Sequence, residues 1–490
     1  MLQKIKNFLF RNTTAKQTVA KNTVWLSISN FGGRLIKAAV IIYAARILGT
    51  AGYGIFSYAL TLAGFFTLFI DPGINSIVMR DASKGDEESK FRIFSTTFYI
   101  KIALLALGVL VVLFIAPYFS ILPGAKALLP VVAMIIIFDN FREFLFAFIR
   151  TKEKMEWEAG IFLLVNVAIV FFGFFVLFTR PTSLALGWAY ALGTGVGAIA
   201  TVIVLWKYLK RMVSRFSARL VWPILQSAWP FAITGALGIL LTNTDILIIS
   251  WMRTASDVGI YSAALRIIQT LYLVPVVFQF SVLPLFSRLA ETDNPRFRAA
   301  LERIIGTLFI ISVPLAVGSF ILGTEIMGFV FGPAYAMGGL AFKILMLTML
   351  VDFPAAIIAN AIFAYNHQKS LIATSAIGGL SNVFFDILLI PYFGITGSAI
   401  ATFCAQVLSN WYLWHMMKKI NYFEVVPHLG KVAISGILMG LFAFLFLSIG
   451  LNIILNIAIC GVLYFGFLYL FREPLLFEFK NIFSPAGGGA

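Results

Sequence analysis

The sequence predicts an all-α integral membrane protein. The chain has 490 residues, of which 60% are hydrophobic and 12% charged, and its mean hydropathy is +0.95. A soluble chain usually carries about 25% charged residues. Apolar runs of about 20 residues, long enough to cross a hydrocarbon core roughly 30 Å thick, recur along the whole chain and indicate about fourteen transmembrane helices. We place the spans at 22–44, 55–79, 92–116, 126–149, 159–178, 184–206, 222–250, 256–287, 302–322, 337–362, 370–390, 395–417, 430–450 and 452–471.

The orientation follows from the connections between these spans. The first 21 residues and every second connection after them are rich in Lys and Arg, whereas the intervening connections hold only Arg46, Lys126, Arg180 and Arg253. Cytoplasmic loops carry the excess of positive charge. We therefore expect a multi-pass protein of the cytoplasmic membrane with its N- and C-termini in the cytoplasm.

The same distribution excludes several classes of function. The net charge of +16 lies in short loops, which argues against a nucleic-acid partner. Cys404 and Cys460 lie inside apolar runs and the three histidines are scattered, so we expect neither a metal site nor a cofactor. The connections are too short to hold a catalytic domain, and we expect that the protein is not an enzyme.

An internal repeat suggests how the spans are grouped. Gly54-Ile55-Phe56-Ser57 after span one corresponds to Gly259-Ile260-Tyr261-Ser262 after span seven, and two further matches occur at similar offsets. We predict two six-helix lobes, residues 1–210 (spans 1–6) and 211–419 (spans 7–12), related by a pseudo-two-fold axis along the membrane normal with a cavity between them. Residues 420–490 add spans 13 and 14 and a short tail. The small residues Gly436 and Gly440 in span 13 predict a helix-packing surface.

Ionisable residues inside the spans are the candidate functional residues, because each costs about 2.5–3.5 kcal/mol near the bilayer centre. Arg34 and Lys37 are three residues apart on one helix face, with no acid on that helix. They predict an anion contact in a cavity, although a pair with an acid on another helix stays open. Arg266 in the second half is a third candidate cation. Lys101 lies nearer a span end, and we expect it to extend to the interface.

The acidic candidates have two readings. Asp139, Arg142 and Glu143 stand at i, i+3 and i+4, which favours a structural ion-pair network over an ion-coupling role. Asp245 and Asp352 are single acids in apolar surroundings, able to bind a proton or Na⁺ or to serve as hydrogen-bonded structural groups.

Four stretches resemble a known family. They are Ala45–Gly54 (ARILGTAGYG), Asp71–Ile74 (DPGI), Arg80-Asp81 and Phe331–Tyr335 (FGPAY). This pattern is similar to the Wzx-type polysaccharide flippases of the multidrug/oligosaccharidyl-lipid/polysaccharide exporter superfamily, and the layout of six, six and two spans matches as well.

The resemblance implies a function. A protein of this family translocates a polyprenyl-pyrophosphate-linked oligosaccharide from the inner to the outer leaflet for cell-surface polysaccharide biosynthesis, by alternating access of two lobes. Arg34, Lys37 and Arg266 would bind the pyrophosphate, and fixed cations in a cavity suit that group. Membrane lipid, a coupling H⁺ or Na⁺, and polysaccharide polymerase or glycosyltransferase partners are the associated expectations.

Two rival functions stay open from the sequence. The related lipid II flippases carry arginines at places similar to Arg34 and Arg266, which makes export of a peptidoglycan precursor the nearer alternative. A multidrug/cation antiporter is more distant, and its binding site would use Asp139, Asp245 and Asp352.

The orientation can be tested at Ser89, which the charge pattern places on the cytoplasmic side. We expect a cysteine introduced by Ser89→Cys to resist impermeant thiol reagents added outside intact cells and to react once the membrane is opened. Rapid labelling in intact cells would overturn the orientation.

Overall fold

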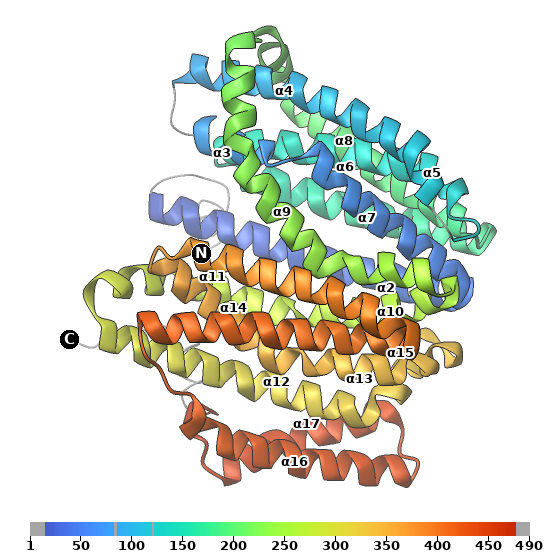
Figure 1. Ribbon diagram of the computed structural model, residues 1–490, viewed down its shortest axis with the longest axis vertical. Helices are drawn as coiled ribbons and strands as arrows, with labels where there is room; N and C mark the ends of the chain where they lie inside the picture. The colour runs from blue at the N-terminus through green and yellow to red at the C-terminus, as the bar shows by residue number, and fades with distance from the viewer. Residues whose placement is uncertain (1–14, 83–85, 120–121, 477–490) are drawn as a thin grey trace, which may run out of the picture. The chain divides into compact units, whose positions relative to one another are not determined.

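A computed structural model describes residues 15–82, 86–119 and 122–476, and every regular element within these ranges is a helix (Figure 1). The predicted all-α fold is thereby confirmed. The basic segment before residue 15 and the tail after residue 476 lie outside the described residues. The chain divides into two compact units, residues 1–262 and 263–490. The lobe boundaries expected near residues 210 and 419 stay a prediction.

In the first unit α2 packs against α7, and α7 packs against α8 (Figure 1). Its elements are α2 (Ala15–Ile70), α3 (Ile74–Ala82), α4 (Glu87–Leu110), η1 (Val111–Ile115), α5 (Ala116–Phe119), η2 (Lys126–Leu128), α6 (Leu129–Thr151), α7 (Met155–Thr179), α8 (Ser183–Ser214) and α9 (Ala218–Met252), followed by α10 (Ala255–Leu271), which runs on into the second unit.

Glycines allow the helices of this unit to approach closely. A Cβ added to Gly33 of α2 would lie 2.8 Å from the side chains of Phe162 and Asn166 on α7, and one added to Gly193 of α8 would lie 2.9 Å from the backbone nitrogen of Ile169. Small residues at such crossings are the usual basis of helix association in lipid, where no hydrophobic force draws helices together.

Helix α2 contains two predicted spans joined across a kink. The kink is at Gly49, whose φ of 68° is readily available only to glycine. Beside it, the Ser183 hydroxyl at the start of α8 donates to the Gly52 carbonyl at 2.7 Å. The turn between spans one and two is therefore held by a second helix.

The second predicted span ends earlier than expected. We placed Asp71-Pro72-Gly73 inside a span at 55–79, but α2 ends at Ile70 and a separate short helix, α3, begins at Ile74. Proline lacks a backbone donor, and Gly73 has a φ of 92°, so this pair ends a helix instead of bending it. A Cβ on Gly73 would overlap Phe231 of α9, so the break also lets α9 approach.

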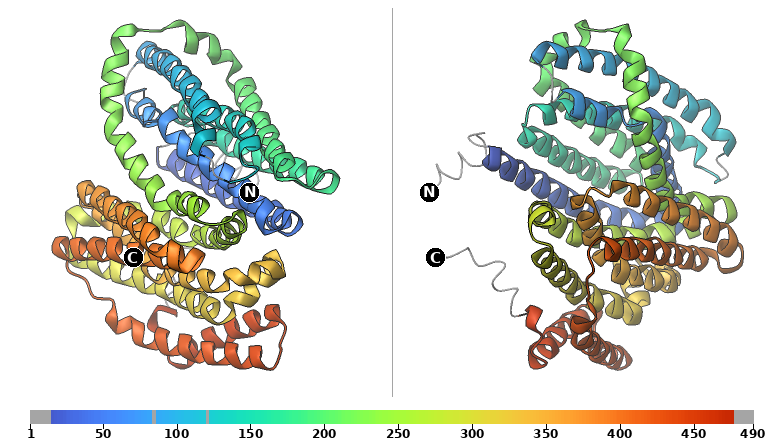
Figure 2. Two further views of the ribbon diagram at one scale, coloured as in Figure 1. Left: turned by 45° about the vertical axis from the view of Figure 1, so that its right-hand side comes forward. Right: turned by 60° about the vertical axis from the view of Figure 1, so that its left-hand side comes forward.

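The second unit is built on the long helix α12, against which the last two helices pack (Figure 2). Its elements are α11 (Leu273–Thr292), α12 (Asn294–Phe331), η3 (Pro333–Gly338), α13 (Gly339–Leu347), α14 (Met349–Ala364), α15 (Gln368–Ile420), α16 (Val426–Ser448) and α17 (Ile453–Leu470). The Tyr464 hydroxyl donates to the Ile310 carbonyl at 3.0 Å. Gly440 faces Val317, 2.9 Å from where its Cβ would stand, so the predicted packing surface on span 13 is confirmed.

Eleven helices among the described residues are long and apolar enough to cross a membrane. Two of them, α2 and α15, are each kinked at a glycine with positive φ, Gly49 and Gly394. The 23-residue helix α6 is not among the eleven, and it carries Asp139, Arg142 and Glu143. The chain is a multi-pass membrane protein, and the expected number of fourteen spans stays a prediction.

Candidate functional site

Arg34 lies on an exposed face of α2. Its neighbours Phe31 and Leu35 are also exposed, while the adjacent Gly33 lies against α7. No acidic side chain pairs with Arg34 among the residues that the structure describes. An unneutralised guanidinium in direct contact with lipid tails would be costly, so its position suits a face lined by water or by an anion.

Lys37 lies one turn further along the same helix and is half-buried. Its ammonium stands over the ring of Tyr190 on α8, 4.7 Å from the ring centroid, and Phe56 contacts that ring edge-on. A cation–π contact of this kind holds a lysine side chain in place. We call Arg34 and Lys37, which are three residues apart on α2, the cationic strip, and its contact with an anion stays a prediction.

Arg266 belongs to the second unit, on α10. It is half-buried, and its guanidinium donates to the Gln269 side-chain oxygen at 3.2 Å, a neutral partner. The contact sets its orientation without removing its charge. The expected convergence of Arg266 with Arg34 and Lys37 stays a prediction.

The charged cluster of α6 forms a chain of ion pairs. Arg142 is buried and lies 2.9 Å from Asp139 and 3.6 Å from Glu143. Glu143 is in turn 3.6 Å from Arg150, which is bound by Glu158 of α7. Arg142 is thus neutralised on its own helix, in the way that the i, i+3 and i+4 spacing predicts.

Lys101 is the cation for which the sequence expectation is wrong. Rather than extending to the interface, its side chain is only 2% exposed and its ammonium lies 3.4 Å from the Asp71 carboxylate. Lys101 also donates to Asn140, and Asn140 donates to the Thr67 hydroxyl. Asp71, the acid that pairs with Lys101, lies at the break between α2 and α3. The sequence pattern places this break inside a span.

Asp245 and Asp386 are acids whose partners are hydroxyl and amide groups. Tyr261 donates to Asp245 at 2.6 Å within the first unit. In the second unit Asp386 is fully buried and accepts from Asn382 at 3.3 Å and, across the kink of α15 at Gly394, from Ser398 at 2.8 Å.

Asp352 joins three helical segments of the second unit. The hydroxyl of Tyr272, at the junction of α10 and α11, donates to one carboxylate oxygen, and Asn410 of α15 donates to the other at 2.7 Å. The Thr348 hydroxyl lies 3.2 Å from that of Tyr272. Sequence reasoning singled out Asp352 but missed Tyr272 and Asn410. Their only signal was a polar residue within a long apolar run.

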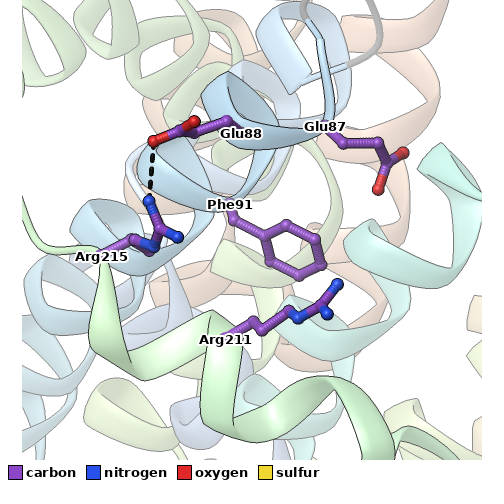
Figure 3. A pocket seen from close by; sticks show the side chains of 5 residues that line it. All are labelled: Glu87, Glu88, Phe91, Arg211 and Arg215. Carbon is purple, nitrogen blue, oxygen red and sulfur yellow. Dashed lines mark hydrogen bonds and ion pairs between the residues drawn. The ribbon is translucent and has the colours of Figure 1, made fainter.

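A pocket of about 260 Å³ lies apart from these residues, between the start of α4 and the end of α8 (Figure 3). Figure 3 shows Phe91 at its centre, with Arg211 and Arg215 on one side and Glu87 and Glu88 on the other. Arg215 is 2.7 Å from Glu88. Both signs of charge are present and partly paired, so the pocket favours neither an anion nor a cation.

The fold defines the class of protein. It is similar to the lipid II flippase MurJ in an inward closed conformation, with a TM-score of 0.75 and 19% identity over 92% of this chain and 100% of that one. The chain therefore shares the fold of that multi-pass membrane protein.

Sequence comparison gives the family. Residues 19–290 match the family described as "Polysaccharide biosynthesis protein", and the chain belongs to it. It is 25% identical to the probable flippase AglR of Haloferax volcanii, over 78% of this chain and 80% of that protein. It is 23% identical to the probable low-salt glycan biosynthesis flippase Agl15 of the same organism, over 95% and 98%. The resemblance to polysaccharide flippases read from the sequence is confirmed.

The Lys101–Asp71 pair can be tested by a double-mutant cycle. We expect Lys101→Met or Asp71→Asn alone to destabilise the protein by on the order of 3 kcal/mol, because each leaves a charge without its partner in the interior. The double variant should recover much of this loss. Thermal unfolding in detergent measures the effect. Additive losses in the double variant would show that the two residues do not act as a pair.

Proposed function

We propose that this protein flips a polyprenyl-pyrophosphate-linked oligosaccharide across the cytoplasmic membrane for cell-surface polysaccharide biosynthesis. The family and the two flippase relatives support the transport of a lipid-linked glycan. The observation that carries the chemistry is the cationic strip of Arg34 and Lys37. In this first unit Lys101 and Arg142 are paired with acids, whereas Arg34 pairs with no acid among the described residues, and Lys37 stands over the Tyr190 ring.

A pyrophosphate is the ligand that such a strip suits. It carries several negative charges on oxygens, and a guanidinium donates two parallel hydrogen bonds to such groups. The lysine beside it adds a point charge. We propose that Arg266 contributes from the second half of the chain, so that the anion is shared by two lobes and passes from one side to the other as they rock. The lipid tail stays in the bilayer throughout.

The orientation and associations belong to the same proposal. The charge pattern of the loops supports both termini in the cytoplasm, with the substrate taken from the inner leaflet. Glycosyltransferases that build the glycan and polymerases that extend it would act before and after this step. The proposed chemistry of the chain itself is binding and release.

Export of lipid II is the second candidate. The likeness to MurJ favours it, and the anionic group to be held is again a pyrophosphate. The two functions therefore share the cationic strip and differ in the sugars that the walls of the cavity must accept.

We propose Asp352 as the coupling residue. It is held by two neutral donors from other helices, Tyr272 and Asn410, with no cation paired to it among the described residues. A carboxylate in that setting binds a proton or Na⁺, and losing the ion changes how three helical segments are held.

The anion site is tested by flipping in proteoliposomes with a fluorescent polyprenyl-pyrophosphate oligosaccharide. We expect Arg34→Gln and Arg266→Gln each to reduce the rate at least about tenfold, because each removes a charge-assisted contact. Arg180→Gln, at an exposed connection, is the matched control and should flip normally. Normal flipping rates in both Arg34→Gln and Arg266→Gln would remove the anion-site assignment. Flipping of lipid II alone would select the second candidate, and efflux of a cationic dye alone would select a drug antiporter.

The coupling proposal predicts a separate result in the same vesicles. An imposed H⁺ or Na⁺ gradient should accelerate flipping by the unaltered protein. Asp352→Asn should remove the acceleration while keeping slow exchange of substrate, because the amide cannot be protonated and has no negative charge to attract Na⁺, while its one oxygen still accepts a hydrogen bond. A gradient effect that survives in Asp352→Asn would place coupling elsewhere, with Asp245 and Asp386 the next residues to change.

A further inference from the structure

The two copies of the repeated segment touch each other in the first unit. Gly54 lies against the backbone of Ala255, and Gly259 lies against the carbonyl of Thr50. A Cβ added to Gly54 would overlap the Ala255 carbonyl oxygen and stand 2.8 Å from the Gly259 nitrogen. One added to Gly259 would overlap the Thr50 carbonyl oxygen and stand 3.0 Å from the Gly54 nitrogen. Side chains larger than hydrogen do not fit at either place.

The contact is reciprocal in a way that the repeat explains. Gly259 and Gly54 are 205 positions apart (259 − 54), as are Ala255 and Thr50 (255 − 50). Each glycine therefore meets the residue four positions before its own counterpart. The Ser256 hydroxyl also donates to the Thr50 hydroxyl at 2.8 Å. We call this set of contacts, made by Thr50, Gly54, Ala255, Ser256 and Gly259, the glycine seam.

Three buried hydroxyl groups close in sequence to the seam glycines lack a hydrogen-bond partner among the described residues. Ser57 and Ser262 stand three residues beyond the two glycines, at matching places in the repeat, and are 1% and 2% exposed. Neither hydroxyl has a hydrogen-bond partner within the described part of the chain. The Tyr53 hydroxyl, beside Gly54, is in the same condition. Buried hydroxyls are normally paired, so unpaired hydroxyls at both copies of one motif need an explanation.

We propose that the glycine seam is the outer gate of the transporter and that Ser57 and Ser262 become sugar-binding hydroxyls when it opens. The inference rests on the proposed function and orientation, which put the connections before Gly54 and Gly259 on the outer side. The glycines let two backbones meet closely enough to exclude a polar ligand. The unpaired hydroxyls make the closed seam less stable than its packing alone would, so it separates when the cavity must face outward.

This arrangement gives two sets of substitutions with opposite effects. A methyl group at Gly54 or Gly259 prevents close approach and favours the open seam. Ser57→Ala and Ser262→Ala remove hydroxyls that gain nothing in the closed state, and so favour the closed seam. Gly64→Ala is the matched control, because Gly64 lies on the same helix with open space where its Cβ would be.

A disulfide across the seam measures how often it is closed. Cysteines are introduced by Thr50→Cys and Ser256→Cys, whose hydroxyls are within bridging reach, after Cys404 and Cys460 have been replaced by alanine. We expect the two cysteines to form the disulfide readily. Cross-linking should be about fivefold slower when Gly54→Ala is added and unchanged when Gly64→Ala is added. It should be faster when Ser57→Ala and Ser262→Ala are added. The proposed gate would be contradicted if the two cysteines fail to cross-link, or if Gly54→Ala and Gly64→Ala slow the cross-linking equally.

A second measurement tests gating without any substrate. A cysteine from Ser57→Cys, in the same alanine background, is exposed to an impermeant maleimide outside intact cells. Labelling should be slow, should increase with Gly259→Ala and should stay slow with Gly64→Ala. Fast labelling regardless of Gly259 would overturn the gate.

Flipping by the cross-linked protein then separates the gate from the proposed function. Loss of flipping on oxidation, recovered with dithiothreitol, supports the gate, and normal flipping by the cross-linked protein overturns it. If the labelling and cross-linking results hold while no lipid-linked oligosaccharide is flipped by the reduced protein, the gate stands and the proposed substrate is wrong.

The sugar-binding role predicts that Ser57→Ala with Ser262→Ala weakens saturation by the oligosaccharide more than by a polyprenyl pyrophosphate that carries no sugar. Equal effects on both would remove that role.

Discussion

A charge placed inside a hydrocarbon layer must be neutralised or must face water, and this constraint organises the whole molecule. Lys101 meets Asp71, and Arg142 meets Asp139, at distances of 3.4 and 2.9 Å. Each pair fixes a helix junction or a helix face as well as removing a charge. Against this background the cationic strip on α2 stands out, because Lys37 is held by an aromatic ring and Arg34 by no acid among the described residues. These two cations are the ones that we propose for the anion site.

Glycine and proline provide the second organising element. Gly49 and Gly394, with positive φ, turn the chain between spans, and Pro72-Gly73 separates α2 from α3. In a membrane such breaks are tolerated only where other groups take up the freed backbone or hold the ends. Ser183 on the Gly52 carbonyl and Lys101 on Asp71 are examples of such supports. The same residue type, at Gly54 and Gly259, makes the contact that we assign to the gate.

Flipping a charged headgroup requires that strong binding and easy release occur in one site. A pyrophosphate held by fixed arginines would bind too firmly to leave unless the cavity changes shape. A seam that closes by backbone packing, yet leaves Ser57 and Ser262 unsatisfied, supplies a small difference between closed and open states. An acid such as Asp352, held by Tyr272 and Asn410, is a place where an ion could bias that difference. In this view the protein works by shifting the populations of its closed and open states.

The helical membrane fold, the repeat and the ionisable residues inside the spans could all be predicted from the sequence, because apolar length and charge spacing are local properties. The sequence anticipated the pairing of Arg142 with Asp139 and Glu143, which lie on one helix. It failed for Lys101, because the partner at Asp71 depends on where α2 ends and which helices meet there. Tyr272 and Asn410 were missed for the same reason, as they reach Asp352 from other segments. Only the tertiary structure decided that the two repeated glycines touch, since residues 205 positions apart are brought together by packing and not by any local preference.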